Sequence, residues 1–246
     1  MTERERFDNA RLLVLGETYG SSGIGTLGER ALHRILKLYF EPDESFHEIK
    51  FLGSVADIKN SEGITEIQTR QLSKLVPKLE KFLPECHVTV VYPLDFTKFI
   101  RTIDKKSGEI SERRRSPKRS DVFDSFYELY NIRSFLSHPN LSVKLVFINV
   151  DEFRFDSERV KGRVRHAVRA ERIPFSIERI VELNTRDDYR VFIPDGLPEE
   201  FCAADFNRLV GKRFKYGYSG IQILLSLGLV EPCGKAGRKI LYKLVK

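Results

Sequence analysis

Hydrophobic and polar positions along the first half of the chain form alternating helix and strand patterns. Apolar residues from Leu32 to Tyr39 recur at helical spacing, which predicts a helix over residues 27–40 that ends before Pro42. Three strand patterns follow, over residues 47–53, 54–59 and 64–70. Residues 60–63 (NSEG) separate the last two and are typical of a tight turn, so these two strands are expected to form a hairpin.

The pattern continues with an amphipathic helix over residues 72–83 and two strongly apolar, β-branched strands over 87–92 and 141–150. Between these strands lie a short hairpin around the turn at residues 105–108 and a helix with an aromatic face over 122–136. Residues 1–155 are therefore expected to form an α/β domain.

The remaining residues show a different pattern. Residues 156–171 are basic without an apolar face, and we interpret them as a linker. Helices are expected over 175–183, 203–210 and 218–227, and short strands over 229–231 and 240–244. This succession predicts a small second domain over residues 172–246.

Composition narrows the class of protein. The chain has 246 residues, of which 41% are hydrophobic and 31% charged, so it is globular. No apolar run approaches the length of a membrane span, and the charged N-terminus lacks a signal-peptide core. Cys86, Cys202 and Cys233 form no CxxC pair, which argues against a zinc site or a disulfide framework. We expect no membrane association and a location in the cytoplasm.

The net charge of +7 is concentrated in the C-terminal part. Residues 156–246 carry 18 basic and 12 acidic side chains, a net of +6. A basic C-terminal part suggests a polyanionic partner; the alternative is a solvated surface that is rich in lysine and arginine.

A glycine-rich stretch precedes the first predicted helix. Gly20, Gly23 and Gly25 follow the apolar residues 11–15 (RLLVL), and such turns can hold a phosphate at a helix N-terminus. Residues 18–25 resemble the cofactor loop of short-chain dehydrogenases, although the glycine spacing differs and the Tyr-xxx-Lys pair of that family occurs only as Tyr242 and Lys246. A nucleotide-cofactor enzyme is thus a weaker alternative function. The other interpretation of this stretch is a loop that leads into the helix and has no role in binding.

Two carboxylates meet in the predicted hairpin. A turn at residues 60–63 pairs Lys59 with Ile64 and therefore places Asp57 opposite Glu66. Opposed carboxylates repel each other unless a cation lies between them, and Mg²⁺ binds through one or two carboxylates plus water. Gln68 lies on the same face as Glu66, and Glu29 at the start of the preceding helix is the third acid. An exposed, solvated acidic hairpin is the alternative.

This order of residues, Glu in a helix, Asp in a strand and Glu-x-Gln in the next strand, resembles the PD-(D/E)XK nuclease superfamily over residues 25–92. The resemblance implies a restriction-endonuclease-like mixed-sheet core and metal-dependent hydrolysis of phosphodiester bonds. It also implies that Asp57, Glu66 and the backbone carbonyl of Ile67 bind Mg²⁺ or Mn²⁺, with Glu29 as an outer ligand and Gln68 in the position of the catalytic lysine.

Gln68 departs from the superfamily pattern, because a glutamine neither accepts a proton as a base nor carries positive charge. Lys59 and Arg70 are candidates for the missing cation. Two functions therefore stay open for this core. The first is a metal-dependent DNA endonuclease, and the second is a catalytically inactive DNA-binding or regulatory protein.

Residues 224–244 (LLSLGLVEPCGKAGRKILYKL) resemble winged-helix domains. In DNA-binding members the third helix enters the major groove, and the wing contacts the backbone. The resemblance gives these candidate contacts: Lys212, Arg213, Lys215, Tyr216, Tyr218, Ser219, Gln222, Lys235, Arg238 and Lys239. Most would neutralise phosphates, whereas Gln222 is suited to reading a base. A winged helix that contacts proteins is the alternative.

Two further basic stretches, residues 113–120 (RRRSPKRS) and 159–172, are candidates for phosphate contacts or solvated surface. The expected partner is a nucleic acid, with DNA favoured, and a homodimer is left open.

Overall fold

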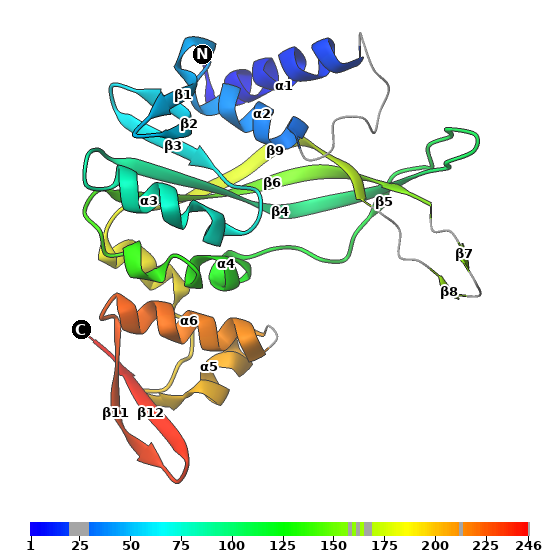
Figure 1. The fold of residues 1–246 in the computed structure, drawn as a ribbon. Coiled ribbons are helices and arrows are strands. Elements are labelled where there is room, and N and C mark those ends of the chain that lie inside the picture. Colours follow the sequence, from blue (N-terminus) through cyan, green and yellow to red (C-terminus); the bar gives the residue numbers. More distant parts are fainter. Residues whose placement is uncertain (20–29, 157–158, 161–162, 165–168, 212–213, 246) are drawn as a thin grey trace. The chain divides into compact units, whose positions relative to one another are not determined.

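The computed structural model describes the chain except for residues 20–29, 157–158, 161–162, 165–168, 212–213 and 246. It is an α/β structure with one large mixed sheet and flanking helices, as expected (Figure 1). The helices are α1 (Glu3–Tyr19), α2 (Arg30–Phe40), α3 (Val76–Phe82), α4 (Phe126–Tyr130), α5 (Ala203–Val210) and α6 (Phe214–Ser226). Among the described residues, no helix is long and apolar enough to cross a membrane.

The large sheet has the strand order β1 (His47–Phe51), β2 (Ser54–Asn60), β3 (Gly63–Ile67), β4 (Val88–Ile103), β6 (Leu141–Phe155) and β9 (Arg169–Leu183), and β5 (Arg114–Arg115) pairs with β4. A three-stranded sheet has the order β10 (Glu200–Cys202), β12 (Lys239–Leu244) and β11 (Val230–Ala236). A small hairpin joins β7 (Arg159–Val160) and β8 (Arg163–Val164). β2 and β3 are antiparallel, whereas β3 and β4 are parallel.

The chain forms two compact units. The first comprises residues 1–47, 95–120 and 146–180, and the second comprises residues 48–94, 121–145 and 181–246. The long strands β4, β6 and β9 each contribute residues to both units.

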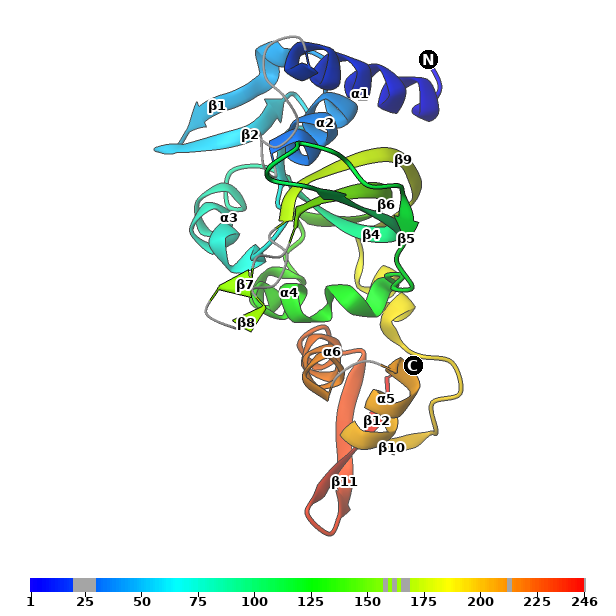
Figure 2. The ribbon, with the colours of Figure 1, turned by 90° about the vertical axis from the view of Figure 1, so that its right-hand side faces the viewer.

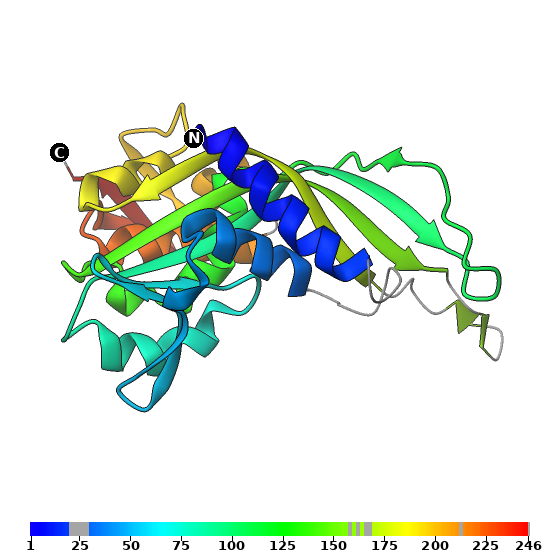
Figure 3. The ribbon, with the colours of Figure 1, turned by 90° about the horizontal axis from the view of Figure 1, so that it is seen from above.

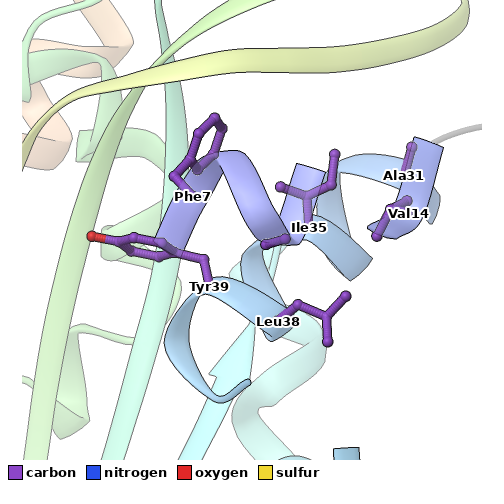
Figure 4. Close-up of a cluster of buried hydrophobic side chains, with 7 residues drawn as sticks. Phe7, Val14, Ala31, Ile35, Leu38 and Tyr39 are labelled. Carbon is purple, nitrogen blue, oxygen red and sulfur yellow. The ribbon is translucent and has the colours of Figure 1, made fainter. Parts of the chain in front are cut away.

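In the first unit, α1 and α2 pack together on one face of the sheet (Figure 3). The apolar residues predicted for α2 are all buried, and Ile35 and Tyr39 meet Phe7 and Val14 of α1 (Figure 4). Ile177 and Ile180 of β9 pack against the same cluster. Burial of these apolar faces holds the helix pair on the sheet.

Residues 11–15 lie within α1, where Val14 is buried while Leu12 and Leu13 are 65% and 56% exposed. A dinucleotide loop needs a β-strand directly before its glycines. Gly20, Gly23 and Gly25 themselves lie outside the described residues. The nucleotide-cofactor interpretation therefore lacks the strand on which it depends.

One predicted element is wrong. Residues 175–183, expected to be a helix, belong to the strand β9, which begins at Arg169 inside the expected linker. Glu182 of β9 forms an ion pair with Lys144 of the neighbouring strand β6 at 2.7 Å, as expected for side chains of adjacent strands. Pro174 fits into β9 because this strand lies at the end of the strand order of the sheet, and edge strands accept proline.

In the second unit, α4 packs against α6 through Phe126. The ring of Phe126 is fully buried, with the rings of Phe192 and Phe206 at centroid distances of 5.0 and 6.2 Å. Gly220 of α6 lies directly on this ring, where a Cβ atom would come within 2.4 Å of it. The expected helix over 122–136 is shorter than predicted, with 3-10 turns at Val122–Ser125 and Arg133–Phe135 on either side of α4.

The C-terminal residues follow the predicted order of helix, helix and two strands. α5 has the predicted bounds, and β11 and β12 form a two-stranded ribbon (Figure 2). β10 adds a third strand, which pairs with β12.

Candidate metal centre and nucleic-acid interface

The β2–β3 hairpin has the register that the sequence predicts. Ile58 pairs with Thr65, Lys59 with Ile64 and Asn60 with Gly63, so the next pair in this register is Asp57 and Glu66. Gly63 makes the turn possible, because its φ is +130° and a Cβ atom there would lie 2.3 Å from the carbonyl oxygen of His87. The side chain of Asp57 is anchored to the opposite strand, where its Oδ2 accepts a hydrogen bond from the N–H of Ile67 at 2.8 Å.

Glu66 is the most unusual acid of this hairpin, because its side chain is only 1% exposed. It lies in β3 opposite Val90 of β4, away from solvent. Burial, and second the negative charge of Asp57, raise the pKa of Glu66 from 4.5 to about 7. Its Oε1 is buried and has no hydrogen-bond partner of good geometry among the described residues, while the backbone N–H of Asp57 is the smallest of the influences that lower the pKa of this carboxyl group. A buried carboxylate oxygen without a donor is a ready ligand for a cation.

Helix α3 supplies a cation that sequence analysis missed. The Nζ atom of Lys78 lies 2.7 Å from Oε2 of Glu66 and favours its charged form. Leu75 and Phe82, three residues before and four after Lys78, are buried, so Lys78 shares their face of the helix. That spacing in the predicted amphipathic helix is the sequence signal by which Lys78 was identifiable.

The hydrogen bonds of Gln68 are made with the backbone near the end of β3 and not with the two carboxylates. Its backbone N–H donates to the carbonyl oxygen of Val91 at 3.0 Å, and its side-chain amide donates to the carbonyl oxygens of Arg70 and Gln71. Lys59, proposed as a substitute cation, lies over the ring of Phe51 at 4.8 Å. Of the two lysines Lys59 and Lys78, Lys78 is the one that contacts Glu66.

Asp57 and Glu66 are compatible with one hard divalent ion. Within the described part of the chain, no three side chains of His, Cys, Asp or Glu gather in a way that would hold a metal ion. Glu29, the expected third acid, lies outside the described residues, directly before α2. Two carboxylates are nevertheless enough for Mg²⁺, which keeps several water ligands.

The expected nucleic-acid contacts lie in the second unit. Tyr218 is 47% exposed, and Gln222, one helical turn later, is half-buried on the same stripe of α6. Ser219 is buried, and Tyr216 contacts the ring of Tyr127 in α4. These two residues therefore serve packing.

The turn of the β11–β12 ribbon has exposed basic residues, Lys235, Arg238 and Lys239. Lys215 belongs to the first turn of α6, while Lys212 and Arg213 lie outside the described residues. The exposed candidates thus lie on one stripe of α6 and on the ribbon.

Fold and site together define an α/β protein with a pair of adjacent carboxylates on a central hairpin. The chain belongs to the family described as "Domain of unknown function (DUF8091)", which matches residues 30–184 and so includes Asp57, Glu66 and Lys78. It is similar to an "Uncharacterized protein" of Treponema pallidum (strain Nichols), with 31% identity over 222 residues, 89% of this chain and 87% of the relative. A comparison with solved structures gives no significant match.

Proposed function

We propose that this protein is a Mg²⁺-dependent nuclease of the PD-(D/E)XK type that hydrolyses phosphodiester bonds in DNA. The order of elements supports this proposal. Helix α2 is followed by the antiparallel strands β2 and β3, then by α3, and then by β4 parallel to β3. A restriction-endonuclease-like core has this order of elements, with the acids on the second and third strands.

The observation that carries the proposal is the pairing of Asp57 with the buried Glu66. One of these two neighbouring carboxylates, Glu66, has a buried oxygen without a hydrogen-bond partner among the described residues, and its pKa stays raised to about 7 although Lys78 pairs with it, so one ammonium offsets only part of the repulsion. A divalent ion would offset their repulsion. When bound, such an ion lowers the pKa of a coordinated water and stabilises charge on the scissile phosphate.

The roles of the side chains follow from their contacts. Asp57 and Glu66 would hold the ion, with the backbone carbonyl of Ile67 as the third protein ligand that the superfamily resemblance implies. Lys78, bound to Oε2 of Glu66, orients this carboxylate and supplies the positive charge expected at position 68. Gln68 has a structural role, because its amide closes the loop after β3.

The C-terminal residues would hold the DNA as a winged helix. The succession of α5 and α6 followed by the β11–β12 ribbon, with β10 paired to β12, supports this proposal. Tyr218 and Gln222 on the exposed stripe of α6 would face the groove, and Lys235, Arg238 and Lys239 on the ribbon would contact phosphates.

One observation favours a second function, that of a catalytically inactive DNA-binding protein. The Lys78 ammonium pairs with Glu66 and offsets part of its charge. If the ion pair takes the place of a metal ion, then the hairpin has no catalytic role and the protein binds DNA without cutting it.

Cleavage of DNA distinguishes the two functions. Supercoiled plasmid, linear duplex and single-stranded DNA are incubated with the full chain in Mg²⁺ or Mn²⁺. We expect cleavage by the wild type and a loss of at least about 100-fold in Asp57→Asn and Glu66→Gln, since each change removes a metal ligand. Glu62→Gln, an exposed change at the turn of the same hairpin, is the matched control and should cleave normally. Equal cleavage by Asp57→Asn and the wild type would refute the assignment, and the absence of cleavage in every metal would favour the inactive binder.

A further inference from the structure

A cavity of about 370 Å³ lies in the first unit between β4 and the basic loop that follows β5. Its lining consists of Phe96, Thr97, Arg115, Ser116, Pro117, Lys118 and Arg119. Two backbone hydrogen bonds fix the loop to β4, from the N–H of Ser116 to the carbonyl of Lys98 at 2.8 Å and from the N–H of Ser120 to the carbonyl of Asp95 at 3.1 Å. The loop is therefore held at both ends, and the residues between them arch over Phe96 and Thr97.

The walls of this cavity carry unbalanced positive charge. Arg115, Lys118 and Arg119 are exposed, and none of them forms an ion pair with a described carboxylate. The nearest acid along β4, Asp95, already pairs with Lys98 at 3.2 Å and with Arg172 at 3.1 Å. Three cations around a small cavity favour an anionic ligand.

Arg113, at the start of the same basic run, differs from these three. Its guanidinium forms two hydrogen bonds with Asp151, at 2.6 and 3.0 Å, and lies 4.0 Å from the ring centroid of Phe99. Arg113 therefore anchors the run, whereas Arg115 and Lys118 are left for a ligand.

The cavity also contains a flat stacking surface. The guanidinium of Arg119 lies 3.7 Å from the ring centroid of Phe96, and that ring packs edge-on against Phe147 at 6.2 Å. A guanidinium this close to the face of an aromatic ring offers a planar group on which an unpaired base can stack. A duplex has no free base faces to offer, so this feature favours a single strand.

We infer that this cavity binds a single-stranded segment of nucleic acid. Arg115 and Lys118 contact the phosphate oxygens, and one base stacks on the surface formed by Arg119 and Phe96. The volume is within the range of sites for ligands of nucleotide size. Binding here requires neither Asp57 nor Glu66 nor a metal ion, so the inference goes beyond the proposed nuclease function and can be tested apart from it.

Fluorescence anisotropy with a labelled oligothymidylate tests the inference, in EDTA so that no cleavage occurs and over a series of salt concentrations. Arg115→Ala/Lys118→Ala should bind about tenfold more weakly than the wild type. The slope of log affinity against log salt should fall by about 1.4, because each phosphate contact on a single strand contributes about 0.7. Lys105→Ala/Lys106→Ala, which removes two exposed lysines from the hairpin of the same unit, is the matched control and should change both values less.

Arg119→Lys separates stacking from charge. It keeps the positive charge but removes the planar group, so the preference for the single strand over a duplex of the same sequence should fall about threefold or more. Circular dichroism verifies that each variant is folded. Unchanged binding by Arg115→Ala/Lys118→Ala, a loss no greater than that of the control, or displacement of the strand by dTMP at equal affinity would overturn the inference. Asp57→Asn should bind the strand like the wild type, whatever the outcome of the cleavage assay.

Discussion

The Nζ atom of Lys78 lies 2.7 Å from Oε2 of Glu66 and links helix α3 to the middle of strand β3. The Glu66 side chain is 1% exposed, whereas that of Lys78 is 28% exposed. The buried carboxylate of Glu66 is thus paired with the ammonium of a partly exposed lysine. The ion pair also fixes one oxygen of Glu66, while the other, Oε1, is buried without a hydrogen-bond partner among the described residues and is the oxygen that we propose binds a metal ion.

Removal of Lys78 should destabilise the metal-free protein. Lys78→Ala leaves Glu66 buried beside Asp57 without its cation, which should lower the free energy of unfolding by about 1–3 kcal/mol at pH 8. Urea denaturation in EDTA measures this change. The matched control is Lys81→Ala on the same helix. This exposed lysine donates a hydrogen bond to Ser54 Oγ at 3.1 Å, and the expected loss is below about 1 kcal/mol. Equal losses in the two variants would show that Lys78 does not stabilise Glu66.

Glu66 should make the stability of the metal-free protein depend on pH. Its pKa is raised from 4.5 to about 7 by folding, so the folded state binds more protons than the unfolded state between these values. Stability contributed by this group is therefore present below about pH 4.5 and is lost as the pH rises to 7. Glu66→Gln does not titrate, so its stability relative to the wild type should rise by about 3 kcal/mol between pH 4.5 and 8. Urea denaturation of both proteins in EDTA over this range measures the difference, and parallel pH curves would contradict the prediction.

The turn that sets the hairpin register should not tolerate a side chain. Gly63→Ala places a Cβ atom 2.3 Å from the carbonyl oxygen of His87 at a φ of +130°, and it should cost about 2–4 kcal/mol. Gly53→Ala is the matched control, because its φ is +73° but no atom lies within 4 Å, so about 1 kcal/mol is expected. Thermal unfolding ranks the two variants, and a larger loss in Gly53→Ala would contradict the structure of this turn.

The contact between α6 and α4 should be equally sensitive. Gly220→Ala brings a Cβ atom within 2.4 Å of the Phe126 ring, which is fully buried and has no room to move aside. We expect a loss of about 1–3 kcal/mol by urea denaturation. Gly234→Ala, on the ribbon with no atom within 4 Å, should change stability by less than about 1 kcal/mol. A neutral Gly220→Ala would mean that α6 is not packed on Phe126.

The hairpin with Asp57 and Glu66 was predictable because its register depends on local information alone. The turn at residues 60–63 fixes the pairing, and the two-residue repeat of a strand fixes the faces. The partnership of Lys78 with Glu66 joins two elements across the fold. The sequence shows that Lys78 lies on the inner face of an amphipathic helix, but not which side chain it meets.

The errors have a physical cause. Ile177, Ile180 and Leu183 have the spacing of a helix, but pairing within the sheet overrides this local pattern in β9. The apolar run predicts a strand that ends at residue 92, yet β4 continues through Pro93 to Ile103. Pro93 is tolerated because it lies beyond the residues paired with β3 and before those paired with β5, where β4 needs fewer donors.

The central claim, that Asp57 and Glu66 form a metal site, is tested most directly by titration of the metal-free protein with Mn²⁺, followed by electron paramagnetic resonance of the free ion. We predict one site in the wild type, bound at least about tenfold more weakly in Asp57→Asn and in Glu66→Gln. Glu62→Gln and Glu80→Gln, which change exposed acids of the same hairpin and of α3, should bind Mn²⁺ like the wild type. Equal Mn²⁺ binding by the wild type and Asp57→Asn would contradict the assignment of this site.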